Sequence, residues 1–94
     1  MTRDATFYFA NLGADVSRCI QATKQGNEAR YEDSRARAYH TLAELRKTAR
    51  PEAYEEGLLI LRGLALARAT PRTLDSFQSS LDSLIAAFAV RLTS

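Results

Sequence analysis

The chain has little proline, glycine or sulfur, and it has no tryptophan. Its 94 residues include two prolines, four glycines and one cysteine. So few turn-forming residues exclude a loop-rich or many-stranded fold, because most turns in such folds need a glycine or a proline. A single cysteine, Cys19, cannot form an intramolecular disulfide. Nothing therefore indicates an oxidising compartment, and we expect a cytoplasmic protein.

Long apolar runs and a strong net charge are also absent. No segment approaches the roughly 20 apolar residues of a membrane-spanning helix, and the first six residues include an acid, so we expect no membrane span and no signal peptide. The net charge is +2. Residues 24–50 hold seven Lys or Arg against four acids. This excess permits weak attraction to phosphate but is no dense basic patch.

What is present is the composition of a helical globular protein. Apolar residues make up 46% of the chain and charged residues 26%, and the length suits one domain, residues 1–94. The good helix formers Ala, Leu, Arg and Glu are prominent. The sequence has no His-Glu-x-x-His motif, no zinc quartet and no glycine-rich phosphate loop. We therefore expect neither enzymatic activity nor a cofactor.

Apolar residues recur every three or four positions in four segments, which predicts helices over residues 4–23, 28–49, 51–69 and 71–94. Gly26 suits the left-handed residue after a helix, Asn27 suits the cap of the next helix, and Pro51 and Pro71 suit first helical positions. Helices of similar length with very short turns predict an all-α fold. Its expected form is an antiparallel up-down-up-down four-helix bundle.

The spacing also predicts which side chains face the core. Asp15 is expected outside the apolar stripe of its helix. The expected inner residues are Phe9, Leu12, Val16, Cys19, Ile20 and Thr23 in the first helix, Tyr31, Arg35, Ala38, Leu42, Leu45 and Ala49 in the second, Tyr54, Leu58, Leu61 and Ala65 in the third, and Leu74, Phe77, Leu81, Leu84, Ile85, Phe88 and Leu92 in the fourth.

Three consecutive aromatic residues, Phe7, Tyr8 and Phe9, are more than one core face accepts. Neighbouring residues of a helix point about 100° apart, so at least one of these rings should lie near the surface. Such a ring would fill a pocket of a partner protein or stack on a nucleobase. The alternative is that the three rings simply close the end of the bundle.

The third helix has a second apolar stripe. Leu59 and Leu66 lie seven residues apart on the side away from the expected seam, and such a stripe needs another surface to cover it. Gly57 and Gly63 each cost up to about 1 kcal/mol in a helix interior relative to alanine, unless they let another helix come close. Together these features favour a homo-oligomer or a protein partner over a lone monomer.

The second helix has a polar face with several interpretations. His40 and Glu44 would give half of a metal site or an acid–base pair, or they belong to a solvated stripe with Asp33, Arg37 and Lys47. A strip of basic and aromatic residues would contact the phosphates of a nucleic acid, or it is an ordinary solvated face. The residues of that strip are Arg30, Arg37, Tyr39, Arg46, Lys47 and Arg50. Cys19 would be a reactive thiol or, on its apolar stripe, a packed hydrophobe.

The second half of the chain resembles known small four-helix-bundle proteins. Residues 61–67, Leu-Arg-Gly-Leu-Ala-Leu-Ala, and residues 81–88, Leu-Asp-Ser-Leu-Ile-Ala-Ala-Phe, resemble ribosomal-RNA intervening-sequence proteins and the accessory variability proteins of diversity-generating retroelements. The resemblance implies a non-enzymatic, ring-forming oligomer that binds nucleic acid or a reverse transcriptase. The chain departs from that pattern because it is shorter and less basic and has no tryptophan near the end of its last helix.

The sequence thus predicts a cytoplasmic, non-enzymatic helical interaction module. We expect it to bind itself or a protein partner through Phe7, Tyr8, Phe9, Leu59 and Leu66. The alternative is a nucleic-acid-binding accessory protein that uses the basic face of the second helix.

Overall fold

The computed structural model describes residues 4–93, and nearly all of them are helical. The elements are α1 (Ala5–Lys24), α2 (Glu28–Arg46), α3 (Pro51–Ala69), the short 3₁₀ turn η1 (Pro71–Thr73) and α4 (Leu74–Thr93). There is no strand within residues 4–93. The predicted all-α fold with four helices is therefore confirmed. None of the described helices combines the length and the apolar character that crossing a membrane requires.

The ends of the helices follow the turn residues closely. Gly26 has a φ of 67°, the left-handed conformation that only glycine adopts cheaply. The Asn27 side chain then caps α2 by accepting a hydrogen bond from the Arg30 N–H at 3.1 Å. The predicted second helix extended to residue 49, but α2 ends at Arg46, where the Thr48 hydroxyl donates to the Leu45 carbonyl at 2.7 Å. Pro71 opens η1 rather than α4.

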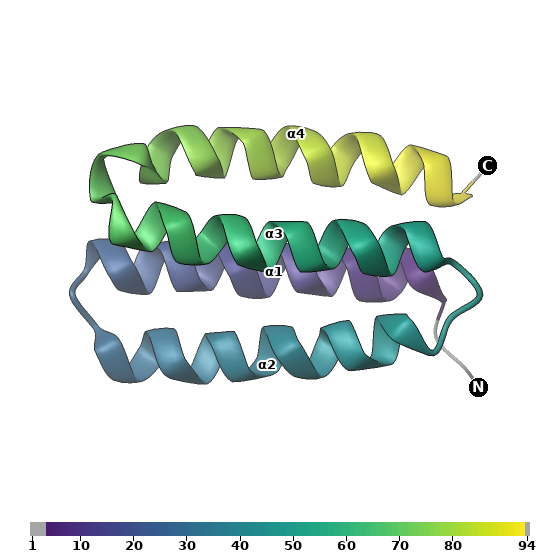
Figure 1. Ribbon diagram of the computed structural model, residues 1–94, viewed down its shortest axis with the longest axis horizontal. Helices are drawn as coiled ribbons and strands as arrows, with labels where there is room; N and C mark the ends of the chain where they lie inside the picture. The colour runs from purple at the N-terminus through teal and green to yellow at the C-terminus, as the bar shows by residue number, and fades with distance from the viewer. Residues whose placement is uncertain (1–3, 94) are drawn as a thin grey trace.

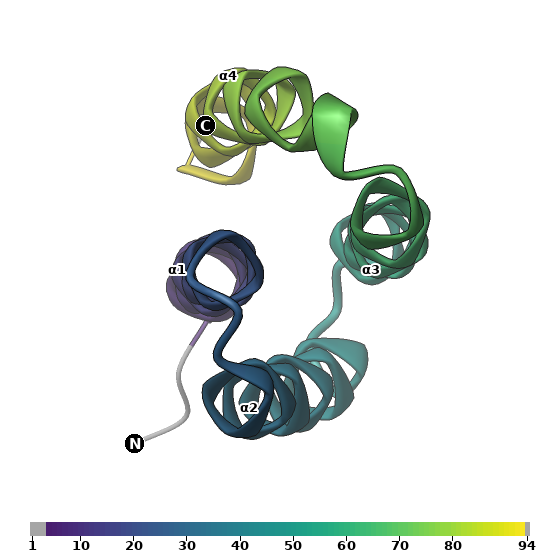
Figure 2. The same cartoon turned by 90° about the vertical axis from the view of Figure 1, so that its left-hand side faces the viewer.

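The four helices lie side by side along the longest axis of the molecule (Figure 1). Viewed from the end, α1 lies between α2 and α4, with α3 on a third side and the fourth side open (Figure 2), and α1 contacts all three of the other helices. This position explains why α1 is buried on several sides. One hydrophobic core draws residues from all four helices, and among its most deeply buried side chains are Phe9, Leu12, Ile20, Leu45 and Leu64.

The expected core faces of α2 and α3 need correction. Arg35 and Ala49 are exposed, and the small side chain of Ser34 is buried where α2 approaches α1. In α3, Ala65 is exposed and Tyr54 and Leu58 are only partly buried. The face of α3 that is buried consists instead of Ala53, Gly57, Ile60, Leu61, Leu64 and Ala67.

Glycine inside the helices serves close packing within the chain. A Cβ on Gly57 would lie 2.8 Å from a methyl group of Leu42, and a Cβ on Gly63 would lie 2.8 Å from the ring of Phe77. Gly13 makes room for Ile85 in the same way. The helices that approach Gly57 and Gly63 therefore belong to this chain, and these two glycines no longer favour a partner.

Candidate functional site

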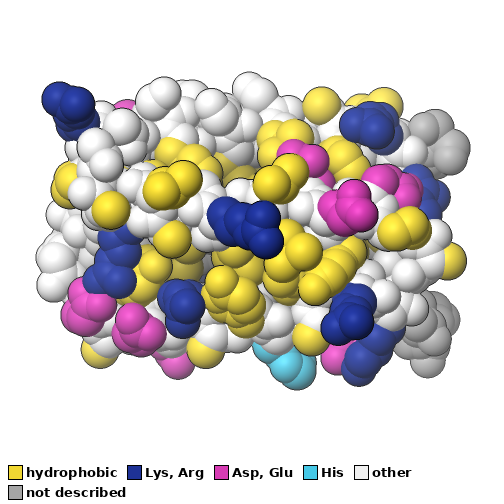
Figure 3. Space-filling model, in the orientation of Figure 1, with side chains coloured by type: hydrophobic (Ala, Val, Ile, Leu, Met, Phe, Trp, Pro, Cys, Tyr) yellow, Lys and Arg dark blue, Asp and Glu magenta, His cyan; other side chains and the backbone are white. Residues whose placement is uncertain are grey.

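The most exposed large apolar side chains of α3 are Leu59 and Leu66. Their exposed fractions are 56% and 72%. Among the described residues, three other large apolar side chains are similarly open: Phe7, Tyr39 and Val90. Hydrophobic side chains are visible over α3 and beside it on the face shown in Figure 3. The second apolar stripe predicted for the third helix is thus at the surface of this chain.

Leu59 and Leu66 border two hollows between α3 and α4, which together we call the α3–α4 groove. The larger hollow, about 350 Å³, is lined by residues that include Gly63, Leu66 and Phe77. The smaller hollow, about 130 Å³, is lined by residues that include Leu59, Phe77 and Leu84. Phe77 and Leu84 pack against the core but are only partly buried. The larger hollow is also lined by Thr70, Thr73, Ser76 and Ser80. The groove therefore combines apolar side chains with hydroxyl groups, and two leucines protrude at its edge.

The three aromatic residues of α1 separate into a buried ring and a surface pair. Phe9 is 1% exposed and stacks on Phe88 with ring centroids 4.7 Å apart. Its ring is therefore in the core, and Phe9 must be removed from the predicted partner interface. Phe7 is 40% exposed and makes an edge contact with the partly buried Tyr8 at 5.4 Å. Neither Phe7 nor Tyr8 lines a hollow of the α3–α4 groove.

Three basic side chains of α2 and of the turn after it lie beside acids. Arg37 pairs with Asp33 at 3.0 Å, and Lys47 pairs with Glu44 at 3.2 Å. Arg50 pairs with the Glu52 carboxylate of α3 at 2.8 Å. The backbone amide of Glu52 and, next in size, this contact with Arg50 lower the pKa of that carboxyl group. Three of the five cations of the strip thus lie beside an acid, which weakens the attraction of the strip to phosphates.

Two aromatic rings near this strip are also covered by arginines. The Arg35 guanidinium lies 4.9 Å from the centroid of the Tyr39 ring. The Arg46 guanidinium lies 5.9 Å from the centroid of the Tyr54 ring. Arg30 supplies its backbone N–H to the cap of α2. The predicted nucleic-acid contacts are thus spread along α2, and the Tyr39 ring is stacked within the chain.

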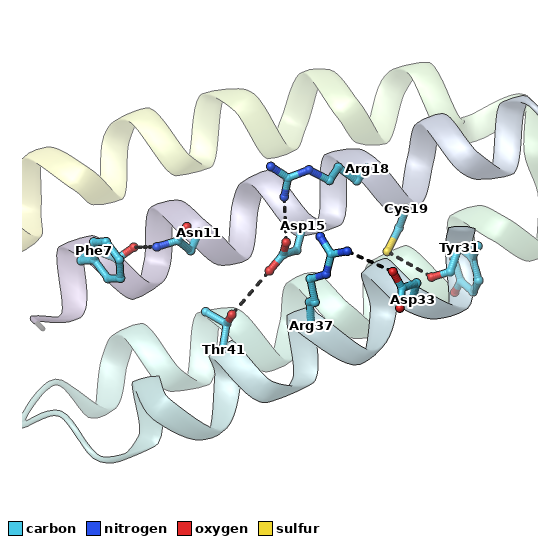
Figure 4. A network of polar contacts seen from close by, with 9 residues as sticks. All are labelled: Phe7, Asn11, Asp15, Arg18, Cys19, Tyr31, Asp33, Arg37 and Thr41. Carbon is cyan, nitrogen blue, oxygen red and sulfur yellow. Dashed lines mark hydrogen bonds and ion pairs between the residues drawn. The ribbon is translucent and has the colours of Figure 1, made fainter. Parts of the chain in front are cut away.

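A polar seam joins α1 to α2, and Asp15 lies at its centre (Figure 4). Asp15 is buried rather than outside the apolar stripe as expected. It accepts a hydrogen bond from Arg18 at 2.8 Å and a longer one from the Thr41 hydroxyl at 3.4 Å. The Arg18 guanidinium compensates the charge of the Asp15 carboxylate and so lowers the free-energy cost of burying it. The signal that could have indicated this burial is the spacing of Asp15 and Arg18, three residues apart on one helix.

His40 borders an open hollow of about 410 Å³ beside this seam, together with Asp15, Asp33 and Arg37. Glu44, the expected companion of His40, is not among the residues that line it. Among residues 4–93, no group of three or more His, Cys, Asp or Glu side chains is arranged to hold a metal ion. The seam is best explained as a polar contact that aligns two helices.

Cys19 is a packed thiol. Its side chain is buried in the core, and the Sγ atom lies 3.9 Å from the Tyr31 carbonyl, to which it donates a weak hydrogen bond (Figure 4). Burial, with a smaller contribution from the charge of Asp15, raises the pKa of the thiol from 9.0 to about 11. Because the pKa is raised in the folded state, the neutral thiol favours folding fully below pH 9. This contribution is lost as the pH rises through 11.

The thiol should therefore react slowly in the native protein. At pH 8 a pKa near 11 lowers the thiolate fraction about 100-fold relative to the unfolded chain, and the core around the sulfur adds a steric barrier. Ellman's reagent should label the native protein more than about 100-fold more slowly than the protein in guanidinium chloride. A cysteine introduced at the exposed position Ala43 is the control, and labelling of Cys19 at a comparable rate would contradict the assignment.

The α3–α4 groove was only half visible in the sequence. The spacing of Leu59 and Leu66 identified its edge, but Phe77 and Leu84 were expected to be fully internal. The available signal was the width of the apolar stripe on α4, which has Leu84 and Ile85 side by side and is wider than one core contact needs. Comparisons of the chain with protein-family models, with curated protein sequences and with solved structures find no match, so the groove is interpreted from its own residues.

Proposed function

We propose that this protein is a non-enzymatic, self-associating helical module whose docking surface is the α3–α4 groove. In this proposal the helices form an antiparallel up-down-up-down bundle with very short turns. The observation that carries the proposal is the exposure of Leu59 and Leu66, 56% and 72%, beside hollows that apolar side chains help to line. Each copy then has two protruding leucines and two hollows, and a second copy supplies the surface that covers the exposed leucines.

Burial of these leucines supplies the driving force. Full burial of a leucine side chain is worth about 2 kcal/mol. Leu66 is 72% exposed and Leu59 is 56% exposed, so a dimer gains about 1.4 kcal/mol from each Leu66 and about 1.1 kcal/mol from each Leu59, and it contains two copies of each. The basic strip of α2 offers no comparable driving force toward a nucleic acid, because Arg37, Lys47 and Arg50 already lie beside acids.

The test is the association state of the full chain and of a Leu66→Glu variant. The full chain should show a mass that rises with concentration in light scattering or sedimentation equilibrium. Leu66→Glu should weaken association by about 100-fold, because about 3 kcal/mol of burial is lost over the two copies. Circular dichroism should show an unchanged fold, since Leu66 is 72% exposed.

Ala43→Glu is the matched control, because Ala43 is an exposed residue of α2 and the substitution adds the same charge. It should leave association unchanged. A chain that is monomeric at every concentration would overturn the proposal. So would a Leu66→Glu variant that associates as tightly as the unmodified chain.

A further inference from the structure

The docking face of α3 has two exposed leucines, and each of them borders a hollow of the α3–α4 groove. Leu59 and Leu66 are seven residues apart, which corresponds to about 10.5 Å along the helix. Leu66 borders one hollow and Leu59 borders the other, while Phe77 and Ser80 line both. The α3 helix of a second copy therefore meets one hollow beside each of the two leucines. This match holds whether the second helix runs in the same direction or in the opposite one.

Charge distinguishes the two directions. Glu55 and Glu56 lie in the first half of α3, one exposed and one partly so, and Arg72 is exposed in η1 at the other end. The acid near Arg72, Asp75, is hydrogen-bonded to Lys24. Helices docked in the same direction would place Glu55 and Glu56 beside their own copies. Helices docked in opposite directions place them beside Arg72 of the other copy. The dimer then has two such attractions, which outweigh the single repulsion between the two exposed Arg62 side chains near the axis.

We infer that the occupant of the α3–α4 groove is a second copy of the chain docked antiparallel, so that Leu59 of each copy contacts Leu66 of the other. This inference rests on the proposed self-association and specifies its direction and register. The two-fold axis passes between residues 62 and 63, the midpoint of the two leucines. The interface is isologous, because each copy contributes the same residues.

The positions around the axis follow from helix geometry. Gly63 is on the α4 side of the leucine stripe, where its Cβ position faces Phe77. Arg62 is exposed and lies about 50° from the stripe on the other side. An antiparallel two-fold dimer brings both Arg62 residues to one rim at the same level. A parallel dimer would separate them across the interface.

Engineered cysteines test this arrangement in the full-length protein. Arg62→Cys should form a disulfide-linked dimer under mild oxidation, because its two copies meet near the axis. The double variant Leu59→Cys, Leu66→Cys should also cross-link, through residue 59 of one copy and residue 66 of the other. Leu59→Cys alone should not, since its two copies are about 10.5 Å apart along the helices, beyond the roughly 7 Å that a disulfide spans between Cα atoms.

The unmodified chain, whose only cysteine is buried, is the control and should not cross-link. Efficient cross-linking of Leu59→Cys alone would overturn the antiparallel register and leave self-association intact. Association of all variants without a cross-link at Arg62→Cys would likewise overturn the inference. A monomeric chain would remove the proposed function itself, so the two failures are distinguishable. An independent measurement is Arg62→Gln, which should tighten association about two- to five-fold by removing a like-charge pair at the rim.

Discussion

Replacing Phe9 by alanine should lower the free energy of unfolding by about 3–5 kcal/mol, the usual cost of truncating a buried phenylalanine. Phe9 is 1% exposed and stacks on Phe88 at 4.7 Å, so it joins the first helix to the last. Its removal leaves a cavity and deprives Phe88 of its ring contact. Urea or thermal unfolding measures the change, which is a large share of the total stability expected for a small domain.

Phe7→Ala is the control for this prediction. Phe7 and Phe9 are the same residue type two positions apart on α1, but Phe7 is 40% exposed. Its truncation should cost about 1 kcal/mol or less, because part of the ring is already in water. Equal losses for the two variants would mean that α1 does not present the face described here to the core.

Replacing Gly57 by valine should destabilise the protein by about 2 kcal/mol through overpacking. A Cβ at this position would lie 2.8 Å from Leu42 and 2.9 Å from Leu12, with Leu45 also in contact at 3.5 Å. All three leucines belong to the core, and none of them is more than 4% exposed. Valine favours the helix slightly more than glycine does, but this gain of a few tenths of a kcal/mol is smaller than the steric cost.

Ala65→Val separates the steric effect from helix propensity. Ala65 is an exposed residue of the same helix, and its replacement by a β-branched residue should cost about 0.5 kcal/mol. Chemical denaturation of the two variants in parallel gives the comparison. If Gly57→Val were no more destabilising than Ala65→Val, the close approach of α1 and α2 to Gly57 would be incorrect.

The candidate groove shows which features sequence periodicity predicts and which features depend on helix packing. The seven-residue spacing of Leu59 and Leu66 was enough to predict an apolar stripe outside the main seam. Whether another helix of the same chain covers that stripe depends on how α4 packs beside α3. In the structure α4 covers Gly63 and Ile60 but leaves the two leucines at the edge.

The incorrect predictions of burial on α1 and α2 have the same cause, because burial depends on which helix packs alongside. Asp15 was placed outside because a carboxylate rarely faces a core, but Arg18 and Thr41 satisfy it in the α1–α2 seam. Arg35 was placed inside because it falls at the correct spacing, but the smaller Ser34 occupies that position. A one-residue rotation of the buried face follows from the neighbour that a helix meets, and periodicity alone does not specify it.

The sequence by itself determined the four helices and most of their ends, because caps, Gly26 and the prolines act through the nearest few residues of backbone. It also determined that α3 has more apolar surface than one seam uses. Only the tertiary structure decided that α1 contacts all three other helices, that Phe9 is buried and Phe7 is not, and that a groove opens between α3 and α4. These features depend on how the side chains of helices distant in sequence pack against each other. The local periodicity of the sequence does not specify that packing.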